Sequence, residues 1–145
     1  MKYFVNIVLC AVLLATALHA ATNADILRIQ SEIRAGNVDT AERALQAAMK
    51  SDPANGGLYN LRGIIEAQRN QIVAAAASFE KAIDLDPHLT GAYLNFGRAC
   101  EILSTQDATA IDRAIGRYRR LLAVDPEAAA VREQLAKLLT KQGEL

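Results

Sequence analysis

The chain has 145 residues and a formal net charge of zero at pH 7, from 16 Lys and Arg against 16 Asp and Glu. This balance excludes a global electrostatic attraction to nucleic acid or to an acidic membrane. The two cysteines are Cys10, in an expected leader, and Cys100, which excludes an intramolecular disulfide in the mature chain.

The first twenty residues, MKYFVNIVLCAVLLATALHA, are typical of a secretory signal peptide. One positive charge at Lys2 precedes an apolar stretch over residues 7–18, shorter than the ~20 residues of a membrane-spanning helix. We expect cleavage after Ala20. Residues 21–145 would then form one mature domain in the bacterial periplasm or outside the cell.

Three alternatives concern the same leader. Ala15-Thr16-Ala17 also fits a small-x-small cleavage site, and an uncleaved leader would remain as an amino-terminal anchor. Cys10 follows Leu9 instead of a small residue, which disfavours bacterial lipid attachment.

Residues 56–89 predict two amphipathic helices separated by a polar break at Asn70-Gln71. In the first helix Tyr59 and Gly63 lie four apart, so another helix can approach closely over the residue without a side chain. The second helix has a small, large, small order at helical spacing, in Ala75, Phe79 and Ala82. We expect these two rows to face each other in a helical hairpin that Asp86-Pro87 ends.

The segment around His88 offers weak signals for a metal or cofactor. His88 is the only histidine of the mature chain, and neither a second histidine nor a cysteine lies at a usable spacing. Asp84-x-Asp86 could indicate a metal or nucleotide-sugar site. Asp86 recurs as Asp52 and Asp125, however, so we interpret it as part of a closing turn and expect no metal, cofactor or catalytic site.

Residues 90–128 repeat the same order with an insertion. Tyr93 and Gly97 are followed by Ala114 and Tyr118, but the prolines before and after lie five residues further apart than in the preceding unit. Residues 104–109 lengthen the turn, as a partner contact or as a tolerated surface insertion. We expect the next helix to begin at a capping box formed by Thr109 and Asp112.

The helix after this insertion carries a basic stripe of Arg113, Arg117 and Arg120. We interpret the stripe as a solvated outer face. Contact with acidic lipid head groups or with an acidic partner is the alternative.

Residues 127–142 repeat the first-helix pattern once more and stop at Gly143. A half-unit at this point predicts a capping helix that covers the last apolar face with a polar outer side. Such a helix could also pair with its copy in another subunit. Its pattern residues are Arg132, Leu135, Ala136 and Leu139.

The prolines define an internal repeat. Pro53 and Pro87 are 34 residues apart, Pro126 lies 39 further on, and each follows an aspartate. This spacing resembles the tetratricopeptide repeat (TPR) family, whose helix-turn-helix unit carries aromatic, Gly, Ala, aromatic, Ala and Pro at matching offsets. Asp25 and Ile29 depart from it in the first unit. The packing residues that carry the resemblance are Tyr59, Gly63, Ala75, Phe79, Ala82, Pro87, Tyr93, Gly97, Ala114, Tyr118 and Pro126.

The resemblance implies an all-α fold, a right-handed α-solenoid of about three units at residues 22–55, 56–89 and 90–128, with a carboxy-terminal capping helix. It also implies a concave groove built from first helices. The corresponding residues are Asn60, Ile64, Ala67, Gln68, Leu94, Asn95, Arg98, Glu101 and Ile102.

The groove residues suggest the kind of partner. The family's clamp for a peptide carboxylate needs Lys, Arg and Asn across three repeats, and only Asn95 fits. We therefore expect an extended or helical protein segment with apolar anchors instead of an acidic peptide terminus.

The expected function is a non-enzymatic protein-protein interaction scaffold of the bacterial periplasm or cell envelope, without cofactor or nucleic acid. Membrane contact would come only through an uncleaved leader or an envelope partner. The alternatives are a self-associating structural subunit, an enzyme accessory subunit, or an enzyme. An enzyme would need a nucleophile with a base, or a paired acid and base, and the mature chain has one histidine and one cysteine. Cys100, one turn after Gly97, is expected to be a buried, inert thiol.

Overall fold

The computed structural model describes residues 23–143, which form seven helices and no strand. This confirms the all-α fold. The expected leader, its cleavage after Ala20 and Cys10 lie outside the described residues. None of the helices that are described is both long and apolar enough to cross a membrane.

The chain divides into two compact units, of which the first ends at Pro53. Its described part is helical over residues 23–34 and again in α2 (Val38–Ser51), and Gly36 takes a positive φ of 79° between them. Ile29 and Leu45 are both buried here. Ile29 stands at the position of Gly63 and is larger than glycine, and Leu45 stands at the position of Phe79 and is smaller than the aromatic ring. The two size changes compensate each other in this hairpin.

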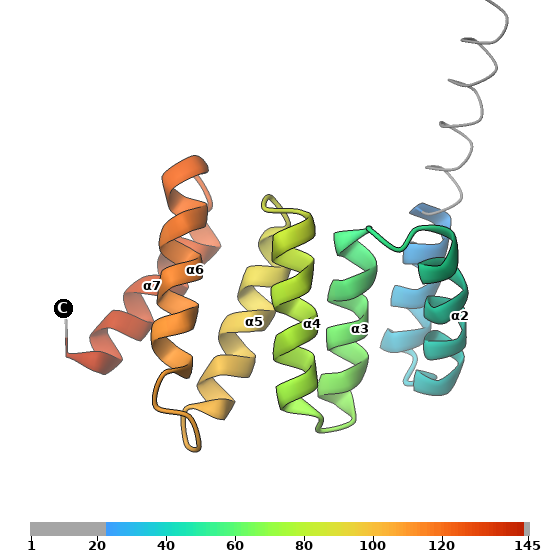
Figure 1. The fold of residues 1–145 in the computed structure, drawn as a ribbon, viewed down its shortest axis with the longest axis horizontal. Coiled ribbons are helices and arrows are strands. Elements are labelled where there is room, and N and C mark those ends of the chain that lie inside the picture. Colours follow the sequence, from blue (N-terminus) through green and yellow to red (C-terminus); the bar gives the residue numbers. More distant parts are fainter. Residues whose placement is uncertain (1–22, 144–145) are drawn as a thin grey trace, which may run out of the picture. The chain divides into compact units, whose positions relative to one another are not determined.

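The second unit begins at Ala54 and contains five helices. Each of these helices contacts the next one in the chain, and Figure 1 shows them side by side from α3 to α7. They are α3 (Gly56–Gln68), α4 (Ile72–Leu85), α5 (Thr90–Leu103), α6 (Ala110–Val124) and α7 (Ala129–Gln142).

Close packing at two glycines holds the hairpins of the second unit together. A Cβ on Gly63 would lie 2.5 Å from Phe79 Cε1, so the Phe79 ring of α4 lies directly over the α3 backbone. Tyr118 of α6 covers Gly97 of α5 in the same way. The expected facing rows of small and large residues are therefore confirmed in both hairpins.

The closing turns contain the aspartates that recur before each proline. Asp86 Oδ1 accepts a hydrogen bond from the His88 backbone N–H at 3.0 Å. Asp125 does the same for Glu127 at 3.2 Å. The interpretation of Asp86 as a turn residue is thus confirmed.

The expected capping box at the start of α6 is wrong. Thr109 stands at the N-cap position of α6, but its side chain caps no helical N–H. Its hydroxyl and its backbone N–H instead donate to Asp107 Oδ1, at 2.7 and 2.9 Å. Asp107 lies two residues earlier and competes for these donors in an Asx-type turn. Asp112 accepts a hydrogen bond from Gln142 of α7 instead.

Candidate functional site

A pocket of about 350 Å³ opens between α3, α4 and α5, at the expected groove. Residues from all three helices line it, and we call it the groove pocket. Its lining residues are Ile64, Ala67, Gln68, Ile72, Phe79, Asn95, Arg98, Ala99 and Ile102.

The two first helices beside the groove pocket are joined by an amide pair. Asn95 Nδ2 of α5 donates to Asn60 Oδ1 of α3 at 3.0 Å. The Phe79 ring, held over Gly63, forms part of the pocket lining from α4. The pocket is therefore positioned by rigid helices and by contacts inside the fold, which favours a preformed site.

The charge in the groove pocket comes from Arg98. Most arginines of the fold donate to a neighbouring group, but Arg98 makes no hydrogen bond or ion pair within residues 23–143. Its side chain is exposed, and Ile102, one turn further along α5, is 56% exposed. The pocket thus offers an unpaired cation beside apolar side chains, an arrangement suited to binding.

The structure separates the predicted groove residues into two groups. Ile64, Ala67, Gln68, Asn95, Arg98 and Ile102 line the groove pocket together. The remaining three do not: Asn60 bonds to Asn95, Leu94 is half-buried against the core, and Glu101 lies outside the lining. Whether these residues bind a partner stays a prediction.

Three residues of the groove pocket were missed from the sequence: Ile72, Phe79 and Ala99. Phe79 was assigned to hairpin packing, but its ring also reaches the pocket. Ile72 is the first residue of α4, and Ala99 follows Arg98 on α5. Ile72 and Phe79 both belong to α4, so this second helix forms part of the pocket lining beside α3 and α5.

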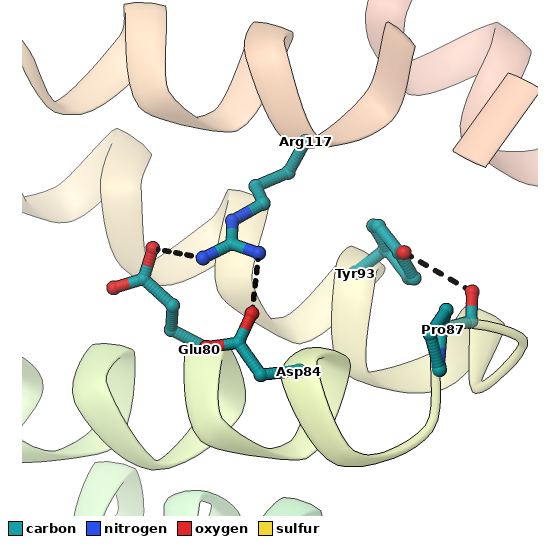
Figure 2. Close-up of polar contacts among 5 residues, drawn as sticks. All are labelled: Glu80, Asp84, Pro87, Tyr93 and Arg117. Atoms are coloured by element: carbon teal, nitrogen blue, oxygen red, sulfur yellow. Dashed lines mark hydrogen bonds and ion pairs between the residues drawn. The ribbon is translucent and has the colours of Figure 1, made fainter. Parts of the chain in front are cut away.

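The interpretation of the arginine stripe as a solvated face is wrong for Arg117. Figure 2 shows this side chain reaching from α6 to two carboxylates of α4, Glu80 at 2.7 Å and Asp84 at 2.6 Å. The Arg117 side chain is only 19% exposed. Because the carboxylates are partly exposed, the network is worth roughly 1 kcal/mol or less per pair.

A second pocket of about 400 Å³ lies along this outer face. Its charged lining residues are the basic Arg113, Arg117 and Arg120 and the acidic Glu80 and Asp112. Arg113 pairs with Asp107 at 2.9 Å, and Arg117 with Glu80. Arg113 and Arg117 are therefore paired with carboxylates within the fold, and only part of the predicted stripe is a solvated basic face.

Groups with catalytic potential are few in the described part of the chain. Among residues 23–143, no cluster of three or more His, Cys, Asp and Glu could hold a metal ion. Asp84, half of the Asp-x-Asp pattern, is bonded to Arg117. Cys100 is fully buried, and burial raises the pKa of its thiol to about 11.

We expect Cys100 to resist thiol reagents in the native state. With a pKa of about 11, about one thiol in a thousand is ionised at pH 8, and the thiolate is the reacting form. Labelling by iodoacetamide should therefore be at least roughly 100-fold slower than that of free cysteine. Mass spectrometry of the folded and urea-unfolded protein checks this. Equal rates in the two states would contradict burial.

The comparisons with known proteins agree with this architecture. The family model described as "Tetratricopeptide repeat" matches residues 26–89 and 106–145. The first TPR of Spaghetti (RPAP3), solved with the HSP90 peptide SRMEEVD, has a TM-score of 0.69 at 20% identity, covering 84% of this chain and 95% of that one. The second TPR domain of human RPAP3, solved with the HSP70 peptide SGPTIEEVD, gives 0.65 at 19% identity, over 83% and 97%.

A mutant O-GlcNAc transferase of Thermobaculum terrenum also matches, with a TM-score of 0.65 at 22% identity, over 84% of this chain but only 22% of the transferase. At such identities the likeness shows the fold alone. Among curated proteins, no sequence match is found.

Proposed function

Because the chain belongs to the tetratricopeptide repeat family, we propose that it is a non-enzymatic scaffold that holds a segment of a protein partner in the groove pocket. The observation that carries this proposal is Arg98, a cation unpaired within the described residues, beside apolar Ile64 and Ile102. A partner segment can pair with Arg98 through a carboxylate or carbonyl while an apolar side chain fills the pocket.

The fold supports a peptide-like occupant. Two structures with this fold hold short peptides, so such a stack of helices can bind an extended segment. In the present chain Asn95 is engaged by Asn60, and Arg98 is the cation of the pocket. A single cation with apolar neighbours favours an internal segment with apolar anchors over an acidic chain terminus.

The partner can first be trapped at the pocket. A photo-reactive phenylalanine analogue at position 102 is expected to cross-link the partner in the native host. The same analogue at Val124, which is 65% exposed on α6, should not. Mass spectrometry of the cross-linked species then identifies the protein to purify.

We expect the double change Arg98→Glu with Ile102→Ala to weaken binding of that partner by roughly 10- to 100-fold, because it reverses the cation and removes an exposed apolar anchor. Leu94 is less suitable, since it packs against the core and its truncation would also reduce stability. Titration calorimetry measures the affinities.

The matched control is Arg120→Glu with Val124→Ala. It makes the same charge reversal and a similar truncation at the same spacing of four residues, on exposed positions of α6. Arg117 is unsuitable because its loss would break the pairs with Glu80 and Asp84. If the control abolished binding and the groove change did not, the site would lie on the outer face.

We also propose that the protein is exported to the bacterial periplasm or cell envelope. The support is the leader sequence, with Lys2 before a short apolar stretch and small residues around Ala20. Intact mass of the protein recovered from its host should correspond to a chain that begins near Ala21. Recovery of the full-length chain from the cytosol would contradict export.

A further inference from the structure

Four residues occupy the same repeat positions, one unit later, as four lining residues of the groove pocket. They are Arg98, Glu101 and Ile102 of α5, which correspond to Ile64, Ala67 and Gln68 of α3, and Tyr118 of α6, which corresponds to Phe79 of α4. Helix α7 contacts α5 as α5 contacts α3. We call these four residues the second groove section.

The second groove section is polar where the groove pocket is apolar. Arg98, Glu101 and Tyr118 bring a guanidinium, a carboxylate and a hydroxyl to positions that are held by hydrocarbon side chains one unit earlier. Glu101 was expected in the groove from the sequence, and it has no place in the groove pocket. The repeat register assigns it to this neighbouring section.

The Tyr118 hydroxyl has no hydrogen-bond partner among residues 23–143, although the residue is only 2% exposed. In this part of the chain no fully buried side-chain nitrogen or oxygen lacks a partner, so the hydroxyl reaches the surface. Its oxygen lies against the α5 backbone at Gly97, directly before Arg98. A buried ring therefore holds a free hydroxyl at a fixed place beside the groove.

The two charged groups of α5 lie close to this hydroxyl. Burial raises the pKa of Tyr118, with a further increase from the Glu101 carboxylate and a decrease from the Arg98 guanidinium, to about 12. Neither charged side chain forms a hydrogen bond or ion pair within the described residues, although they stand three apart on one helix. A donor, an acceptor and a hydroxyl thus converge without satisfying one another.

We propose that the second groove section binds a carboxamide side chain, of glutamine or asparagine, on the segment whose apolar side chain fills the groove pocket; this inference rests on the proposed function. The amide oxygen accepts from Arg98 and Tyr118, and the amide NH₂ donates to Glu101. A carboxylate would meet the like charge of Glu101, and an ammonium that of Arg98. The opposite charges of the section therefore favour a neutral group that both donates and accepts.

The spacing of the helices sets the distance between the two side chains of the partner. The first helices α3 and α5 contact each other, and packed helices lie about 8–10 Å apart. An extended segment advances about 3.3 Å per residue, so the carboxamide lies about three residues from the apolar anchor.

A phage-displayed library of short random segments, selected on the protein purified from its host, tests the proposal. Selected peptides are expected to carry an apolar residue and a glutamine or asparagine about three residues away. One such peptide is then synthesised with its carboxamide residue as glutamine, glutamate, lysine or alanine. In fluorescence anisotropy the glutamine peptide should bind roughly 3- to 10-fold more tightly than the other three.

Tyr118→Phe isolates the hydroxyl, because it keeps the buried ring. It should weaken the glutamine peptide by roughly 3- to 10-fold and leave the alanine peptide unchanged, a coupling that loss of packing would not produce. Tyr93→Phe is the matched control on α5. The Tyr93 hydroxyl donates to the Pro87 carbonyl at 3.1 Å, away from the groove (Figure 2), so this change should leave both affinities unaltered.

Glu101→Gln should reverse the preference from glutamine to glutamate, because both donors can then pair with a carboxylate that nothing repels. Selected peptides with an apolar anchor but an acidic, basic or random residue at the second position would overturn this inference alone. Equal weakening of the glutamine and alanine peptides by Tyr118→Phe would also overturn it. Selection of no peptide would overturn the proposed function as well.

Discussion

Replacing Gly63 with leucine is expected to lower the free energy of unfolding by at least ~1–3 kcal/mol and to open the α3–α4 hairpin first. A Cβ at this position would lie 2.5, 2.6 and 2.9 Å from three carbons of the Phe79 ring. The ring is itself only 3% exposed and lies directly over the α3 backbone, so a side chain at Gly63 would displace it. Urea denaturation measures the stability, and hydrogen exchange shows which hairpin opens.

Gly116 on α6 provides the matched control. It is also a helical glycine, but a Cβ there would meet nothing within 4 Å. Gly116→Ala should therefore raise stability by ~0.5–1 kcal/mol, the usual advantage of alanine over glycine in a helix. Gly63→Ala, the same change in the packed position, should lower it. An unchanged urea midpoint for Gly63→Leu would show that the two helices do not need this close approach.

Tyr118→Ala is expected to be the most destabilising single truncation, by ~3–5 kcal/mol, because it removes a buried ring and leaves a cavity over Gly97. Tyr118 is 2% exposed and is among the largest fully buried side chains of the described residues. Such a loss is a large share of the total stability of a small domain, typically ~5–15 kcal/mol. Denaturation curves of the purified variants measure it.

Tyr118→Phe keeps the ring and separates packing from the hydroxyl. Its expected cost is below ~1.5 kcal/mol. Burial also raises the pKa of Tyr118 to about 12. The folded state therefore favours the neutral phenol, so this part of the stability is complete below the ordinary tyrosine pKa of ~10 and is lost as the pH rises through about 12. Tyr118→Phe should reduce the loss of stability between these pH values. Equal stabilities of the Ala and Phe variants would contradict the role of the ring.

At the groove pocket, the residues that share one face of a helix could be predicted from the sequence, whereas those contributed by a neighbouring helix could not. Arg98 and Ile102 were identified because they lie four apart on a first helix, and spacing on one helix determines which residues share a face. Ile72 and Phe79 were missed because the pocket floor also depends on how α4 packs beside α3 and α5. Glu101 was assigned to the groove although it lies outside the pocket lining.

The sequence by itself determined the all-α repeat architecture, the Asp-Pro turns, and the pairing of Gly63 with Phe79 and of Gly97 with Tyr118. These features rest on spacing within one helix or one hairpin, where the chain connection already brings the residues together. Only the tertiary structure decided that Arg117 binds Glu80 and Asp84, which lie 37 and 33 residues earlier in the chain. Contacts between helices of different hairpins depend on how the hairpins pack, and no spacing within one helix contains that information.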